Sequence, residues 1–311
     1  MNTRANLTLL TLFVFSLTCF GQAKPIELSY DRTDDNDYIF YATNKSDFNY
    51  HVAVYFKYLT GLTADTKLPA GKNISSGRTR ILKLSQFGLN SPNFNWGYTY
   101  KKGVANPDLK EVPYVLPVTA GTQVRMIPLK SLEELYTDRV PQEDFYAIGF
   151  QLSEGDTICA ARGGKVIDLI QDQESDLENL RFSSTRNQIV IEHKDGSQAR
   201  YSVFKKNSAM VKLSDEILTG TPLALAGGEK YESGLHTRLV ISYLKYDADG
   251  DGGNAGEYSW AYLKPKFITA FDTENAIVLE KPLKYTAAIN EEVIMAEMSK
   301  REKKKYRKTK N

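Results

Sequence analysis

Hydrophobic and polar positions alternate in short segments over most of the chain. Clear examples are residues 37–42 (DYIFYA) and 50–58 (YHVAVYFKY). This period of two is typical of β-strands with one buried face. Turn-forming residues separate the segments, as at 44–46 and 71–77, which is the spacing of a β-sandwich. We therefore expect an immunoglobulin-like β-sandwich domain over residues 24–115.

A second β-rich block follows and is expected to form a separate domain over residues 144–275. Its clearest signal is the segment 187–193 (NQIVIEH), followed by Lys-Asp-Gly and a second apolar segment at 199–204. Asp-Gly between two such segments favours a tight hairpin, because both residues tolerate positive φ. The pattern predicts an antiparallel β domain.

The two blocks are separated by a region with closely spaced prolines at 107, 113 and 117. Proline stiffens a connector and resists regular helix. We place the domain boundary here and expect a linker over residues 116–143. The protein is thus expected to be mainly β, with two domains.

The chain ends in a basic segment, residues 276–311, in which a short helix is expected over 290–305. The last twelve residues carry eight Lys or Arg against Glu302 alone, whereas the whole chain has a formal charge of only +2. A basic tail, Lys300 to Lys310, indicates an anionic surface as a partner, and a solvated, frayed terminus is the alternative. Its one aromatic residue, Tyr306, is too few for nucleic-acid binding.

The first 23 residues have the features of a signal peptide. Arg4 precedes the apolar run 7–20, which is too short to span a membrane, and cleavage is expected after Ala23. Lipid attachment at Cys19 is the weaker alternative, because Thr18 stands where a small residue is required. We expect an exported protein, periplasmic or extracellular, that retains only Cys159, as a buried structural thiol.

Several motifs in the second block resemble the lysostaphin or LytM-type zinc peptidases of family M23, which have the duplicated hybrid motif fold. Residues 145–168 read FYAIGFQLSEGDTICAARGGKVID and are similar to the family's YAIDF strand and the AA-x-x-G-x-V strand after it. Residues 187–204 resemble its N-x-V-V-I-x-H-x-D-G hairpin and YSHL strand. The segments 211–225 and 233–236 follow in the family's order. The resemblance implies a LytM-like domain.

The resemblance also implies a zinc site whose ligands are absent from this sequence. The family holds zinc with one His, one Asp and the second His of an H-x-H pair, leaving a position for water. The matching positions here are Phe145, Gly149 and Arg238. Val203 replaces the His that assists catalysis. We therefore expect no zinc and a degenerate member of the family.

His236 is the retained residue of the family's catalytic set, and we interpret it as structural. Arg238 stands in the former zinc pocket, where its guanidinium remains charged and would repel a dication. It could instead pair with a carboxylate of a peptide or of a partner loop. Arg238 and His236 are accordingly the candidate binding residues. His193, which matches a family histidine outside the catalytic set, is also interpreted as structural.

A weak calcium candidate lies at Asp247, Asp249 and Asp251. These carboxylates are spaced as at the start of a calcium loop, but position twelve would be Tyr258 rather than Glu. The alternative is a solvated hairpin insertion. With three histidines in the chain, no nucleophile and base set is indicated either.

Three functions follow from these observations. The first is an exported, non-catalytic cell-envelope protein that binds peptidoglycan or regulates a cell-wall hydrolase, as degenerate LytM-type domains do by analogy. The second is an interaction protein that docks a partner through the sandwich domain and the basic tail. The third is a residual metallopeptidase with displaced ligands. The first is the leading hypothesis.

Overall fold

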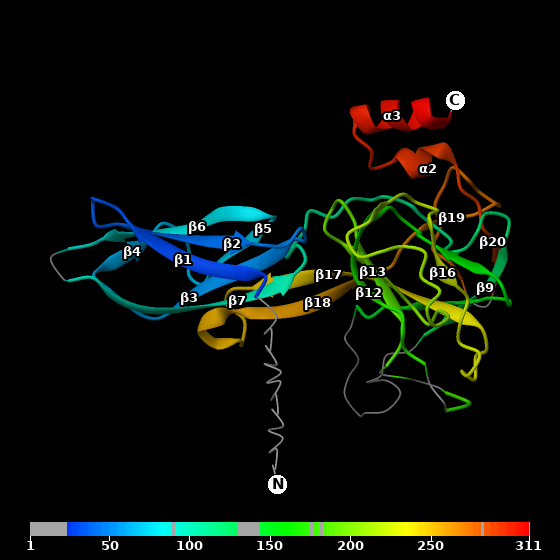
Figure 1. The fold of residues 1–311 in the computed structure, drawn as a ribbon, viewed down its shortest axis with the longest axis horizontal. Coiled ribbons are helices and arrows are strands. Elements are labelled where there is room, and N and C mark those ends of the chain that lie inside the picture. The colour runs from blue at the N-terminus through cyan, green and yellow to red at the C-terminus, as the bar shows by residue number, and fades with distance from the viewer. Residues whose placement is uncertain are drawn as a thin grey trace, which may run out of the picture.

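The computed structural model describes residues 24–88, 91–129, 144–174, 177–180, 183, 185–280 and 283–310. The expected signal peptide, residues 1–23, and the second half of the expected linker, 130–143, lie outside these ranges. The protein is mainly β, as the sequence predicts, and has antiparallel sheets and two short helices near the C-terminus (Figure 1).

The N-terminal domain is a sandwich of two antiparallel sheets. One sheet has the order β1-β2-β6-β4 and the other β5-β3-β7. Their strands are β1 (Ile26–Arg32), β2 (Tyr38–Asn44), β3 (Tyr50–Thr60), β4 (Leu62–Ala64), β5 (Ala70–Ile74), β6 (Gly77–Gln86) and β7 (Asn93–Lys102). Alternate residues of the strands, such as Phe40, Val52 and Leu82, are fully buried between the sheets. The alternation in the sequence therefore reflects one core-facing side of each strand.

The second domain is built on a twisted sheet with the order β15-β12-β13-β14-β17-β10-β9-β20, to which β18 adds beside β17. Its strands are β9 (Gln123–Pro128), β10 (Ile148–Gln151), β12 (Gly164–Ile170), β13 (Gln188–Glu192), β14 (Gln198–Ser202), β15 (Glu216–Ile217), β17 (His236–Asp247), β18 (Glu257–Leu263) and β20 (Lys284–Thr286). There are also two small ladders, β11 (Thr157–Cys159) with β16 (Pro222–Leu225) and β8 (Tyr114–Val115) with β19 (Phe267–Ile268). They contribute residues such as Ile158, Leu223 and Phe267 to the core of this domain.

The Asp-Gly hairpin expected between 187 and 204 is confirmed. β13 and β14 pair antiparallel, and Gly196 has a φ of +86° in the turn between them. The φ value explains why a glycine is needed here. Cys159 is buried as expected, and burial raises the pKa of its thiol.

Residues 116–129, expected as the first part of a linker over 116–143, belong to the second domain. β9 pairs with β10 on one side and β20 on the other. Leu116, Val124 and Met126 lie in the core of this domain. The prolines indicated a connector, but pairing with strands distant in sequence decides the structure of this segment.

In place of the single helix expected over 290–305, the structure has two helices, α2 (Glu291–Met295) and α3 (Lys300–Lys310). A 3₁₀ turn, η1 (Gly253–Ala255), lies in the connection between β17 and β18. The break has a physical reason, because Glu297 turns inward to the buried Arg162 and Ser299 caps α3. Among the described residues, no helix is long and apolar enough to cross a membrane.

The two domains pack closely against each other. Ile167 of β12 and Val190 of β13 lie in the core of the sandwich. The long hairpin β17–β18 runs along the sandwich beside β3 and β7 (Figure 1). Asn106 fixes it there, since its side chain bonds both the carbonyl and the amide of Tyr246, at 2.7 and 3.1 Å.

Candidate binding site

Three strands place the candidate site residues at one level of the main sheet. Arg238 of β17 is the register partner of Gly149 on β10 and of Ser202 on β14. Their neighbours Ile148, Tyr201 and Leu239 are buried in the core. Because side chains alternate along a strand, Arg238 and Gly149 both lie on the face of the sheet that is turned away from this core. The structure thus brings together two of the positions that the sequence singled out.

The space in front of Gly149 is filled by its neighbour strand. A Cβ at this position would lie 3.2 Å from Cβ of Ile127, 3.3 Å from its carbonyl oxygen and 3.4 Å from Cδ2 of Leu129. These are tight contacts, so a larger side chain would require Ile127 and Leu129 to shift by a few tenths of an ångström. The position that carries an Asp ligand in the resembled family has no donor atom and is closely packed by β9.

His236 is held by hydrogen bonds to both ring nitrogens. Nδ1 lies 2.7 Å from the carbonyl oxygen of Gly234, which only accepts, so Nδ1 carries the hydrogen. Nε of Arg238 donates to Nε2 of His236 at 3.1 Å. Both nitrogens are therefore engaged, and neither offers a lone pair to a metal ion.

The surroundings of His236 keep its ring neutral. The residue is 1% exposed. Burial lowers its pKa to about 4, the bond to Gly234 opposes this, and the positive charge of Arg238 lowers it further. His236 is thus uncharged at neutral pH and accepts the hydrogen bond from Arg238.

Arg238 is half-buried between His236 and Tyr231. Its guanidinium carbon lies 4.9 Å from the centre of the Tyr231 ring. Burial lowers the pKa of Arg238, Tyr231 opposes the shift, and the charge of Arg186 adds to it. Two guanidinium groups that repel each other in a partly desolvated place favour an anion near them.

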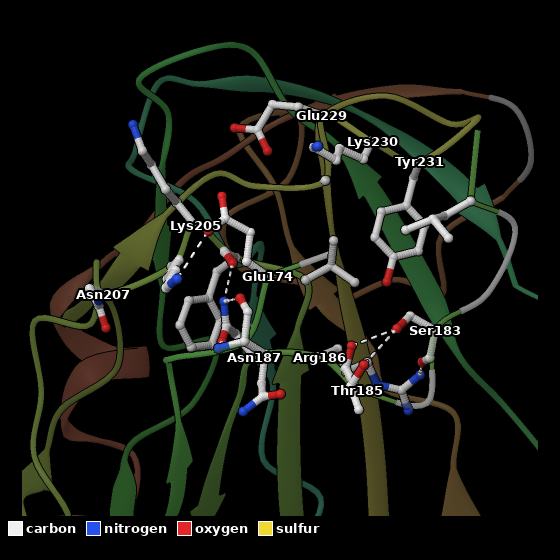
Figure 2. A pocket seen from close by; sticks show the side chains of 16 residues that line it. Glu174, Ser183, Thr185, Arg186, Asn187, Lys205, Asn207, Glu229, Lys230 and Tyr231 are labelled. Carbon is white, nitrogen blue, oxygen red and sulfur yellow. Dashed lines mark hydrogen bonds and ion pairs between the residues drawn. The ribbon is translucent and has the colours of Figure 1, made fainter. Parts of the chain in front are cut away.

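A cavity of about 530 Å³ opens beside this group (Figure 2). Tyr231 and Arg186 line it on one side, and Val203 and Gly228 form part of its wall. Lysines and glutamates also line the cavity, and of these Lys206 pairs with Glu174. Lys230 pairs with Glu178, which lies outside the lining. Arg238 and His236 do not line the cavity themselves, but Tyr231, which does, lies against the guanidinium of Arg238.

The floor of the cavity is ordered by buried polar contacts. The side chain of Asn187 donates to the carbonyl oxygens of Phe204 at 2.9 Å and Gln173 at 3.1 Å, and accepts from the amide of Gln173 (Figure 2). Asn187 thereby ties the end of β14 to the loop after β12. Satisfied buried amides of this kind hold a site in one shape.

Other predicted positions lie apart from Arg238 or serve packing. Phe145 packs against Tyr262 of β18, with ring centres 5.0 Å apart. Val203 has a φ of +67°, an uncommon conformation for a β-branched residue, and lines the cavity. His193 is buried and its Nδ1 lies 2.8 Å from the carbonyl oxygen of Gly163.

The side chains of the site do not fit a zinc ion. Gly149 has no donor atom, Arg238 is a cation and His236 has no available lone pair. Within the described ranges, no group of three or more His, Cys, Asp or Glu side chains is placed to hold a metal ion. We therefore derive no chemical step through zinc.

The acidic loop at 247–251 lies against the sandwich domain. Oδ2 of Asp249 is 2.5 Å from Nζ of Lys67, and Oδ1 of Asp247 accepts from the amide of Asp249 at 2.9 Å. Asp251 is exposed. Calcium binding by this loop stays a prediction.

Sequence reasoning missed Arg186 and Tyr231, the two residues that connect Arg238 to the cavity. Arg186 directly precedes the hairpin segment that begins at Asn187, and Tyr231 lies three residues after Gly228. Neither stands in a motif of the resembled family. Their proximity depends on the folding of two loops toward each other and has no local signal in the sequence.

Comparisons with known proteins give the chain no family assignment. No family model matches it, and no curated protein matches it. Structural neighbours are proteins of the M23 peptidase class at low identity. One is a Pseudomonas aeruginosa protein named as peptidase M23, with 12% identity over 70% of this chain and 90% of that one and a TM-score of 0.27.

Two further structures are similar at the same level. One is a zinc-containing peptidase from Vibrio cholerae, with 12% identity over 74% of this chain and 83% of that one and a TM-score of 0.29. The other is Csd3 from Helicobacter pylori, with 10% identity over 76% and 75% and a TM-score of 0.27. At these values the likeness carries no argument about the activity of this chain.

Proposed function

We propose that this chain is an exported cell-envelope protein whose second domain binds a carboxylate-bearing peptide without hydrolysing it. The ligand would be a stem peptide of peptidoglycan or a loop of a cell-wall hydrolase. The observation that carries the proposal is Arg238, a partly desolvated cation that bonds His236 and stacks on Tyr231 at the edge of a cavity.

The contacts of Arg238 leave it suited to a carboxylate. Nε donates to His236, and no ion pair of Arg238 with a carboxylate is found in the part of the chain that the structure describes. The terminal nitrogens of a guanidinium match a carboxylate in a bidentate pair. Such a charge-assisted hydrogen bond contributes about 1.5–3 kcal/mol. The cavity would hold the remainder of the peptide.

The proposal assigns no hydrolytic step to the site. Gly149 has no donor atom, Nε2 of His236 accepts from Arg238, and the side chain of Val203 can neither donate nor accept a proton, which argues against a bound zinc hydroxide. Arg238 stabilises His236 in its neutral form, which favours a fixed binding surface over acid-base chemistry. The apolar run at 7–20 supports export to the periplasm or the cell exterior.

The test is co-sedimentation of residues 24–311 with isolated peptidoglycan sacculi, in the presence of a chelator. We expect binding that survives high salt and falls about tenfold or more in Arg238→Met. Arg125→Met is the matched control, since Arg125 is an exposed residue of β9 in the same sheet.

Equal binding by Arg238→Met and the native chain would refute the role of Arg238. No binding to sacculi would exclude peptidoglycan as the ligand. Capture of a cell-wall hydrolase by the native chain but not by Arg238→Met would then identify the partner loop as the ligand. Release of peptide fragments from sacculi in the presence of zinc would contradict the proposal as a whole.

A further inference from the structure

The C-terminal helix α3 carries five of its eight positive charges as a stripe on one face. The basic residues of this stripe recur with the spacing i, i+3, i+4, i+7 and i+8, which places them on one side of an α-helix. The stripe consists of Lys300, Lys303, Lys304, Arg307 and Lys308. Four of these side chains are exposed and that of Lys303 is half-buried. The stripe extends over roughly 12 Å of helix.

The opposite face of α3 is turned toward the second domain. Glu302, Lys305, Tyr306 and Thr309 line a cavity of about 330 Å³ between the helix and residues of β15 and α2. Their spacing is again i, i+3, i+4 and i+7. The helix therefore has a face toward the protein and a separate cationic face toward solvent.

Several contacts hold α3 in this orientation. Oε2 of Glu302 accepts from the amide of Ser299 at 2.7 Å, and Oγ of Ser299 accepts from the amide of Glu302, as in a capping box. Lys194 of the hairpin turn donates to Glu302 at 3.0 Å and to the carbonyl oxygen of Glu297 at 3.0 Å. Just before the helix, Glu297 forms a bidentate pair with Arg162, at 2.5 and 2.8 Å.

None of the five cations of the stripe has a carboxylate partner within the described residues. The acidic residue of α3, Glu302, pairs instead with Lys194 of the second domain. Five like charges side by side repel one another, at a cost in helix stability. The charge of the stripe is thus compensated by nothing that the structure describes. An anionic partner would supply the compensation.

We propose that this stripe docks the protein on an anionic lipid surface. A plane of anionic headgroups can attract all five cations of the straight, solvent-facing stripe together, at about 1 kcal/mol for each Lys or Arg near the surface. Tyr306 faces the protein, so no aromatic side chain of the stripe is available to stack on bases. The exposed face has no apolar residue, and attachment is therefore electrostatic rather than by insertion.

Docking through α3 would also orient the candidate binding site. In Figure 1, α3 lies at one side of the second domain, and the loops of the larger cavity lie at the opposite side. A protein lying on its stripe would present this cavity away from the lipid. This proposal is independent of the identity of the ligand in the cavity.

The test is sedimentation of residues 24–311, which contain all the described contacts, with vesicles of phosphatidylcholine alone or with one quarter phosphatidylglycerol. We expect binding to the anionic vesicles alone, and its loss when salt is raised from about 0.1 to 1 M, where the Debye length falls from about 10 to 3 Å.

Changing the five residues of the stripe to Gln should weaken binding on the order of 100-fold or more. The matched control changes five exposed lysines outside α3 to Gln and alters the net charge equally: Lys57, Lys101, Lys212, Lys245 and Lys284. Retained binding of the control is expected.

Equal loss of binding in both variants would overturn the proposal, because net charge and not the stripe would then be responsible. Binding of the native chain to soluble polyphosphate but not to anionic vesicles would also overturn it, in favour of a polymeric partner. Circular dichroism of the stripe variant establishes that the fold is intact.

Discussion

The buried ion pair of Arg162 gives the largest expected effect of a single substitution. Arg162 and Asp195 have side chains that are each 2% exposed, and their atoms Nη2 and Oδ2 are 2.9 Å apart. The same guanidinium binds Glu297, 18% exposed, in a bidentate pair. Burial by itself disfavours the charged arginine, but Glu297 and the other neighbours raise its pKa above the usual value. The charge is therefore retained.

Replacing Arg162 by Met removes the cation and leaves the Asp195 carboxylate buried without its counterion. Breaking a buried pair from one side costs about 3–5 kcal/mol. Arg80→Met is the matched control. Arg80 pairs with Asp65 at the surface, where the side chains are 50% and 41% exposed, so its loss should cost no more than about 1 kcal/mol.

Urea unfolding followed by tryptophan fluorescence measures both costs, since Trp96 and Trp260 report on the two domains. A double-mutant cycle with Glu297→Gln separates the pairwise contribution. Glu297→Gln alone should cost about 1.5–3 kcal/mol and almost nothing in the Arg162→Met background. If Arg162→Met costs no more than Arg80→Met, the network does not stabilise the fold as described.

Two further outcomes follow from the surroundings of His236. The pKa of His236 is about 4 in the folded state and near 6.5 in the unfolded chain, so the unfolded chain takes up the proton first as the pH is lowered. The free energy of unfolding should therefore decrease as the pH is lowered from about 6.5 to 4, by on the order of 3 kcal/mol. Urea unfolding at several pH values checks this, and a slope unchanged in His236→Asn would contradict it. Gly228→Ala should cost about 1–3 kcal/mol, because φ is +98° and the new Cβ would lie 2.9 Å from Cγ1 of Val203 and 3.0 Å from Nδ1 of His236. Gly121→Ala, at φ +88° with nothing within 4 Å, should cost less, and equal thermal shifts would refute the packing argument.

The sequence predicts those parts of the fold that depend on local signals. Alternating strands and the Asp-Gly turn at Gly196 are such signals, and the structure confirms them. β9 was missed because its neighbours in the sheet, β10 and β20, are distant in sequence. The break before α3 was missed because it depends on the pairing of Glu297 with Arg162.

The candidate site shows the same division between local and tertiary information. The motifs singled out Gly149 and Arg238, and the register places them opposite each other. The bond from Arg238 to His236 and the ring of Tyr231 beneath it arise from the packing of loops. No residue pattern marks Arg162 as buried, since an arginine between Ala and Gly is more often exposed.

The central claim is that Arg238 makes the second domain a receptor for a carboxylate. The most direct test measures the affinity of residues 24–311 for one stem-type peptide with its α-carboxylate either free or amidated, in the presence of a chelator. We expect the free peptide to bind tenfold or more tightly, with the difference lost in Arg238→Met and retained in Arg125→Met. Equal affinity for the two peptides, or binding that requires added zinc, would contradict the account.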